Sequence, residues 1–112
     1  MIKVLWFPHS GEPQIVQRPS LPFEESLYLG PGFVLLYNLD RYSPNASLKK
    51  FGRIVSNIPG DAILICEDVT TGKPIDVPSD ILQQFPRILK ADEEQRIRFV
   101  EEMENMAGVI RI

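Results

Sequence analysis

The sequence predicts a single α+β domain spanning residues 1–112, built on a mixed or mostly antiparallel sheet of about four to six short strands. Three observations lead to this class: an unbroken apolar run in mid-chain, ten prolines spread along the sequence, and an amphipathic pattern near the C-terminus. A chain of 112 residues can bury one hydrophobic core but is too short for two domains. We therefore expect a C-terminal amphipathic helix packed on one face of the sheet.

The apolar run at residues 61–68 is predicted to be the central strand, because turn signals frame it at residues 59–60 and 71–72. Isoleucine is frequent in the run, and polar residues do not alternate with apolar ones. Such a run is typical of a strand that is buried on both faces.

Two further strands are predicted at residues 2–7 and 33–39, which are rich in β-branched and aromatic residues. Residues 12–18, bounded by Pro13 and Pro19, are expected to form an edge strand that pairs with the first strand as a hairpin. Residues 23–29 instead predict one or two helical turns, because their large apolar side chains recur at near-helical spacing.

A middle helix is predicted over residues 48–55, with Ser47 as its N-cap. Gly52 weakens this helix by about 1 kcal/mol relative to Ala, which does not overturn the prediction. Residues 75–77 are expected to be a short edge partner of the central strand.

Residues 79–85 predict a turn of helix that Pro86 ends, which leaves residues 87–90 as a short strand or an extended connector. The last helix begins at Asp92, whose spacing to Gln95 forms a capping box. Gly108 is placed to end that helix, and residues 109–112 are apolar enough to add a final strand.

Composition narrows the function classes. The formal charge of −3 gives no broad basic field, so we find no strong nucleic-acid signal. The N-terminus lacks the pattern of a signal peptide and no apolar run reaches membrane-spanning length, so we expect a cytoplasmic protein without membrane association. The Asn45-Ala46-Ser47 sequon is read as a coincidence rather than a glycan site.

No group of residues predicts catalysis, so we expect a protein that is not an enzyme and that has no cofactor and no metal. His9 and Ser10 are adjacent, but no sequence motif marks an acid partner for them, and Cys66 lies in the most apolar strand. The carboxylates at residues 67, 68 and 76 are too few for a calcium shell, and one cysteine with one histidine cannot hold structural zinc. The glycine turns at residues 30–32 and 71–73 lack the rest of a phosphate-binding motif.

The candidate interaction residues are one basic cluster and one tryptophan. Lys49, Lys50 and Arg53 lie on one side of the predicted middle helix, with Tyr42 shortly before them. An ordinary solvated helix face explains the same cluster. Trp6 points to an interface only if it is exposed, because buried tryptophan is routine.

The sequence also resembles a family of small proteins of unassigned function that phages and large DNA viruses encode. The resemblance lies in strand and turn patterns at residues 1–5, 11–13, 30–36, 64–67 and 72–73, followed by an acidic helix. It implies a viral or phage setting, with the host cell as the location, and it carries no activity onto any residue. We expect a small protein-interaction module that binds another protein. Its strand edges also make a homo-oligomer possible. The alternative is a small-ligand or nucleotide-binding domain.

Overall fold

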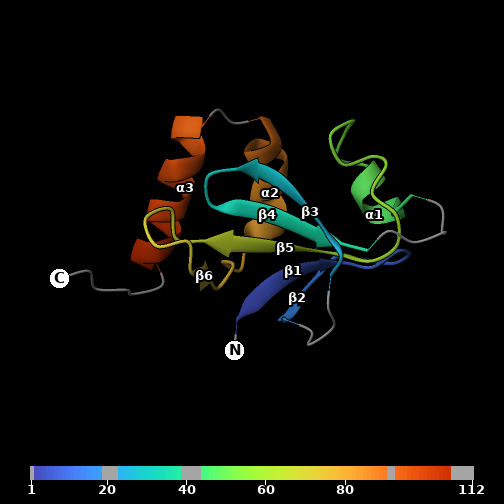
Figure 1. The fold of residues 1–112 in the computed structure, drawn as a ribbon, viewed down its shortest axis with the longest axis horizontal. Helices are drawn as coiled ribbons and strands as arrows, with labels where there is room; N and C mark the ends of the chain where they lie inside the picture. The colour runs from blue at the N-terminus through green and yellow to red at the C-terminus, as the bar shows by residue number, and fades with distance from the viewer. Residues whose placement is uncertain (1, 19–22, 39–43, 91–92, 107–112) are drawn as a thin grey trace.

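A computed structural model of the chain describes residues 2–18, 23–38, 44–90 and 93–106 (Figure 1). In chain order the elements are β1 Lys3–Phe7, β2 Gln14–Gln17, β3 Glu25–Gly30, β4 Phe33–Tyr37, α1 Ala46–Lys49, β5 Ala62–Glu67, β6 Pro74–Ile75, α2 Ile81–Lys90 and α3 Glu93–Met106.

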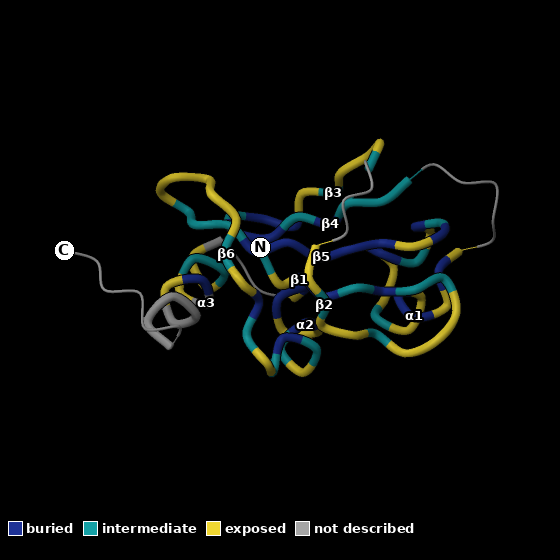
Figure 2. Tube along the Cα trace, turned by 90° about the horizontal axis from the view of Figure 1, so that it is seen from below, coloured by how far each residue is buried: buried dark blue, intermediate teal, exposed yellow. Residues whose placement is uncertain are grey.

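The strands form one six-stranded sheet in the order β2-β1-β5-β4-β3, and β6 pairs with the end of β5. Every pairing in it is antiparallel. The α+β class is therefore confirmed. The predicted central strand is confirmed as well, because β5 lies in the middle of the sheet and residues 62–66 are all buried (Figure 2).

The register assigns alternate residues of each strand to two faces. Leu5 pairs with Leu64, and Leu64 pairs with Leu35, in a row that points toward the helices. One residue along, Trp6 pairs with Ile63, which pairs with Leu36, on the opposite side. We call these sides the helix face and the open face.

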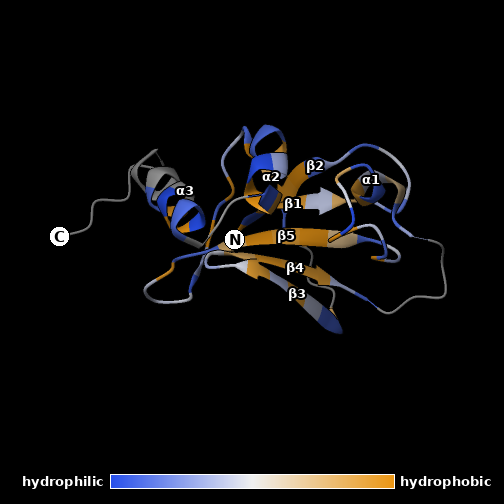
Figure 3. Ribbon diagram, turned by 90° about the horizontal axis from the view of Figure 1, so that it is seen from above, coloured by the Kyte–Doolittle hydropathy of each residue, from blue (hydrophilic) through white to orange (hydrophobic). Residues whose placement is uncertain are grey.

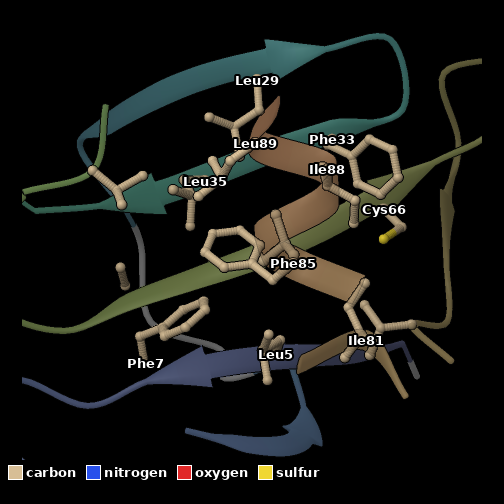
Figure 4. Packing of buried hydrophobic residues seen from close by; sticks show 14 of the residues in the cluster. Leu5, Phe7, Leu29, Phe33, Leu35, Cys66, Ile81, Phe85, Ile88 and Leu89 are labelled. Atoms are coloured by element: carbon tan, nitrogen blue, oxygen red, sulfur yellow. The ribbon is translucent and has the colours of Figure 1, made fainter. Parts of the chain in front are cut away.

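The main core lies between the helix face and α2 (Figure 4). Phe85 of α2 packs on Phe7 and Phe51, with ring centroids 5.1 and 5.0 Å apart. Val100 of α3 is fully buried in the same core, so the C-terminal helix packs on this face. The other buried apolar side chains of the described helices are Leu48, Ile81, Ile88 and Leu89.

The helix predicted at residues 23–29 is wrong, because residues 25–30 form the edge strand β3. Leu27 pairs with Leu35 on the helix face, and Tyr28 pairs with Val34 on the open face. Pairing with β4 gives the backbone N–H and C=O groups of this segment hydrogen-bond partners, and Leu29 is buried in the sheet. A short, uncapped helical turn would provide neither the hydrogen bonds nor the burial.

The middle helix is shorter than predicted and begins two residues earlier than the predicted cap allows. Asn45, not Ser47, is the N-cap of α1, and α1 ends at Lys49. Gly52 has φ +120°, a conformation that ends a right-handed helix. Leu48 and Val55 are nevertheless buried as expected, whereas Ile54 is 58% exposed.

The prediction that Pro86 ends a helix is wrong too, because α2 runs through it to Lys90. Pro86 lies on the exposed side, while Ile88 and Leu89 reach the core. Burying two such side chains contributes roughly 1.5–3 kcal/mol each, which offsets the cost of about 3 kcal/mol for an interior proline.

Helix α3 confirms the predicted last helix within its described residues. Its expected cap Asp92, its expected stop Gly108 and the expected tail strand at residues 109–112 lie outside the described residues. Within the described part of the chain, no helix combines the length and the apolarity needed to cross a bilayer.

Candidate functional site

The open face of the sheet carries a second apolar cluster. Val4 and Ile63 are fully buried there and Ile65 is nearly so. Side chains of Ile2, Trp6, Val16, Phe23 and Leu36 pack around these three and remain partly exposed. Among the described residues, no helical side chain belongs to this cluster, whereas α1, α2 and α3 all contribute to the main core.

The open face forms continuous cross-strand rows. One row joins Trp6 of β1 to Ile63 of β5 and on to Leu36 of β4. The next row joins Ile65 of β5 to Val34 of β4 and on to Tyr28 of β3. These two rows consist of uncharged side chains, and β5 is apolar from Ala62 to Cys66 (Figure 3).

Trp6 is half-buried, so one part of its ring packs on the cluster and another part meets solvent. Tyr28 on the same face is 65% exposed, a larger value than those of Ile15 and Ile54, the other exposed large hydrophobic side chains of the described residues. The sequence analysis missed Tyr28 because it assigned residues 23–29 to a helix. The available signal was the alternation of Leu27, Tyr28 and Leu29 between two faces.

The basic cluster does not meet the tryptophan. Lys49, Lys50 and Arg53 are all exposed around the end of α1. Leu48 of α1 packs in the main core, so this cluster lies on the helix-face side, opposite to the face that carries Trp6. Tyr42 lies outside the described residues.

The residues of the sequon have a structural role. Asn45 is fully buried, and its Nδ2 donates to the carbonyls of Phe7 at 2.9 Å and Gly60 at 2.7 Å. Its Oδ1 accepts from the backbone N–H of Leu48 at 3.0 Å. Ser47 Oγ donates to the carbonyl of Gly11 at 2.6 Å. A side chain held in this way is inaccessible to a glycan-transferring enzyme.

The single cysteine is an inert packing group in this geometry. Burial, with a smaller contribution from the charge of Glu67, raises the pKa of the Cys66 thiol to about 12. At neutral pH the nucleophilic thiolate is therefore scarce.

Two of the three carboxylates considered as cation ligands accept hydrogen bonds from backbone groups. Asp68 Oδ1 accepts from the N–H groups of Thr70 and Thr71, and Asp76 Oδ1 accepts from the N–H of Lys3. Among the described residues, no cluster of three His, Cys, Asp or Glu side chains could hold a metal ion.

Comparisons with known proteins add no family: no family model, curated protein or solved structure matches this chain. The resemblance to small phage and viral proteins thus stays a prediction. A functional assignment has to rest on the geometry of the chain, and the open face is its most distinctive surface.

Proposed function

We propose that the chain is a non-enzymatic protein-interaction module that binds a partner protein through the open face. The observation that carries this proposal is the second apolar cluster, which the described helices leave uncovered. A sheet usually buries one face on its own core and exposes polar residues on the other. Here the second face is apolar as well, which is typical of a binding surface.

The chemistry of the face supports a protein partner over a small ligand. Trp6 and Tyr28 offer aromatic rings beside aliphatic rows, and aromatic residues are enriched at interface hot spots. The rows of the open face are uncharged, so the partner surface that fits them is apolar with a polar rim. We place this activity in the cytoplasm, of an infected host cell if the viral resemblance holds.

Affinity capture with a matched pair of variants tests the proposal. Tyr28→Lys puts a charge on the open face at its most exposed apolar position, and Ile54→Lys makes a similar change at a 58% exposed position in the turns after α1. Both positions are exposed enough for the fold to survive, which circular dichroism checks. We expect the wild type and Ile54→Lys to capture the same protein from a lysate and Tyr28→Lys to lose it.

Two results would overturn the proposal. One is capture of the same protein by both variants, which would remove the open face from the contact. The other is a small molecule retained on an otherwise solitary chain in native mass spectrometry, which would promote the small-ligand alternative.

A further inference from the structure

Within the described part of the chain, no strand pairs with the outer edge of β3, a feature independent of the open face. Strand β3 lies at one end of the sheet order, paired with β4 on one side only. It runs along a margin of the molecule away from α2 (Figure 3). A six-residue edge strand with a single charged side chain, Glu25, is a template for pairing with another strand.

The ladder hydrogen bonds show which backbone groups this edge presents. Glu67 N donates to Gly32 O across β5 and β4. Because antiparallel strands alternate bonded and non-bonded pairs, Val34 and Leu36 then direct their backbone groups toward β5. The residues between them, Leu35 and Tyr37, direct theirs toward β3.

The same alternation carries through to β3. Leu27 and Glu25, the partners of Leu35 and Tyr37, use their backbone groups on β4. Ser26 and Tyr28 therefore direct their N–H and C=O groups outward. These four groups are the hydrogen-bonding capacity of the free edge.

We propose that two copies of the chain pair antiparallel through β3, in a register centred on Leu27. Only this centre places Ser26 of each copy opposite Tyr28 of the other, so that all outward groups bond in two closely spaced pairs. Ser26 and Tyr28 both point their side chains to the open face, so the sheet and its open face continue across the two-fold axis. Leu27 then meets its symmetry mate on the helix face.

Charge complementarity selects a second copy as the occupant. In this register Glu25 lies opposite Leu29 of the other copy and beside its Gly30. The side chain of Arg96 covers Gly30: a Cβ built there would lie 2.5 Å from Arg96 Cδ and Nη1. Arg96 Nε donates to Ile88 O at 3.0 Å, which fixes the guanidinium on the helix face.

Glu25 pairs with Tyr37, and the Tyr37 side chain packs on the helix-face core. Paired residues of adjacent strands point to the same face, so the Glu25 carboxylate lies on the helix face, as Arg96 does. The two-fold axis repeats this Glu25–Arg96 approach at both ends of the interface. It also keeps the two Glu25 side chains apart, because they lie at opposite ends of the paired strands. Diagonal neighbours on adjacent strands are within reach of long side chains.

The opposite edge of the sheet fits pairing less well. Strand β2 has four residues, and Pro13 directly before it removes a donor from that edge. Arg18 N donates to Ile2 O, so by the same alternation Ile15 and Gln17 carry the outward groups of β2. Gln17 therefore supplies a matched control position.

The first test compares Ser26→Pro with Gln17→Pro by sedimentation equilibrium over a range of concentrations. Proline at position 26 removes an outward N–H in each copy and leaves the ladder to β4 intact, so the dimer dissociation constant should rise on the order of a hundredfold. Gln17→Pro should leave it unchanged. A wild type that stays monomeric up to millimolar concentration, or a dimer that survives Ser26→Pro, overturns the proposal.

A second test reads the register by disulfide formation. Residues that face each other in a non-hydrogen-bonded pair have Cα atoms about 4.5 Å apart, a distance that a disulfide spans. Leu27→Cys should therefore give a covalent dimer under mild oxidation. Ser26→Cys should not, because its two copies are displaced by two residues, about 7 Å along the strands. Cross-linking of Ser26→Cys alone overturns the register.

A charge reversal tests the choice of occupant. Glu25→Arg should raise the dissociation constant by about tenfold and Glu12→Arg, an exposed position with the same change in charge, should not. Equal effects of the two would contradict the Glu25–Arg96 contact. Tyr28→Lys keeps the backbone of the edge, so a dimer that persists while partner capture is lost separates this inference from the proposed function.

Discussion

Asn45 joins three segments of the chain. Through one amide it holds the end of β1 at Phe7, the turn before β5 at Gly60 and the first turn of α1 at Leu48. All three backbone groups are buried or nearly so at this junction, where water cannot replace a lost partner. A local sequence pattern cannot reveal this role, because two of the three contacts are distant in sequence.

We expect Asn45→Ala to lower the free energy of unfolding by about 2–4 kcal/mol, because it removes an N-cap and two buried hydrogen bonds to the carbonyls of Phe7 and Gly60. Asn57→Ala is the matched control at an exposed position, and it should change stability by less than about 0.5 kcal/mol. Urea denaturation followed by circular dichroism measures both. Equal losses of stability in the two variants would show that the hydrogen bonds of the Asn45 amide do not stabilise the fold.

Cys66 makes stability depend on alkaline pH. Its pKa is raised from 9.0 to about 12 by burial, so above pH 9 the unfolded chain loses this proton and the folded chain keeps it. The unfolded state then binds fewer protons, and stability falls as pH rises. Between pH 8 and pH 10 the loss should be about 1 kcal/mol greater for the wild type than for Cys66→Ala. Identical pH profiles for the two proteins would contradict burial of the thiol.

At the scale of elements, sequence patterns predicted the strands better than the helices. Residues 62–67 and 33–37 were found because runs of β-branched and apolar residues carry their own signal. Strand β3 was missed because its pairing with β4, a tertiary contact, decides its conformation. The reach of α2 beyond Pro86 was missed for a similar reason, since Ile88 and Leu89 gain their burial only from the assembled sheet.

The docking of α3 on the sheet depends on a glycine. Gly32 lies in the β3–β4 turn at φ +86°, and a Cβ there would overlap the side chain of Val100 and lie 3.2 Å from Glu67 O. Gly72 has a similar φ of +71° with nothing within 4 Å of the corresponding position. The two glycines therefore share the backbone cost of a substitution and differ in the packing cost.

We expect Gly72→Ala to destabilise the fold by roughly 1–2 kcal/mol, the cost of a left-handed conformation with a side chain. Gly32→Ala should cost about 1–3 kcal/mol more, because the added methyl must displace Val100. Thermal and urea unfolding of the two variants measure the difference. Equal losses would mean that α3 does not rest on the β3–β4 turn.

For the whole molecule, only part of the candidate surface could be predicted from the sequence. Trp6 was selected from its residue type, and its place on the open face follows from alternation along β1. That Trp6, Leu36 and Tyr28 share one surface required the strand order, which no local pattern specifies. The same strand order separates Trp6 from Lys49, Lys50 and Arg53, which sequence reasoning could not place relative to it.

Hydrogen exchange across the whole sheet distinguishes its centre, its two edges and its proposed self-pairing in one measurement. The amides of β5 bond to neighbours on both sides and should exchange only with global unfolding. The outward amides of Ile15 and Gln17 on β2 should exchange fast at every protein concentration. The outward amides of Ser26 and Tyr28 on β3 should slow as concentration rises through the dimer dissociation constant, because dimerisation adds hydrogen bonds to these two positions. Concentration-independent exchange at Ser26 and Tyr28 would leave β3 as a solvent-exposed edge, and slowing at Ile15 and Gln17 instead would move the interface to β2.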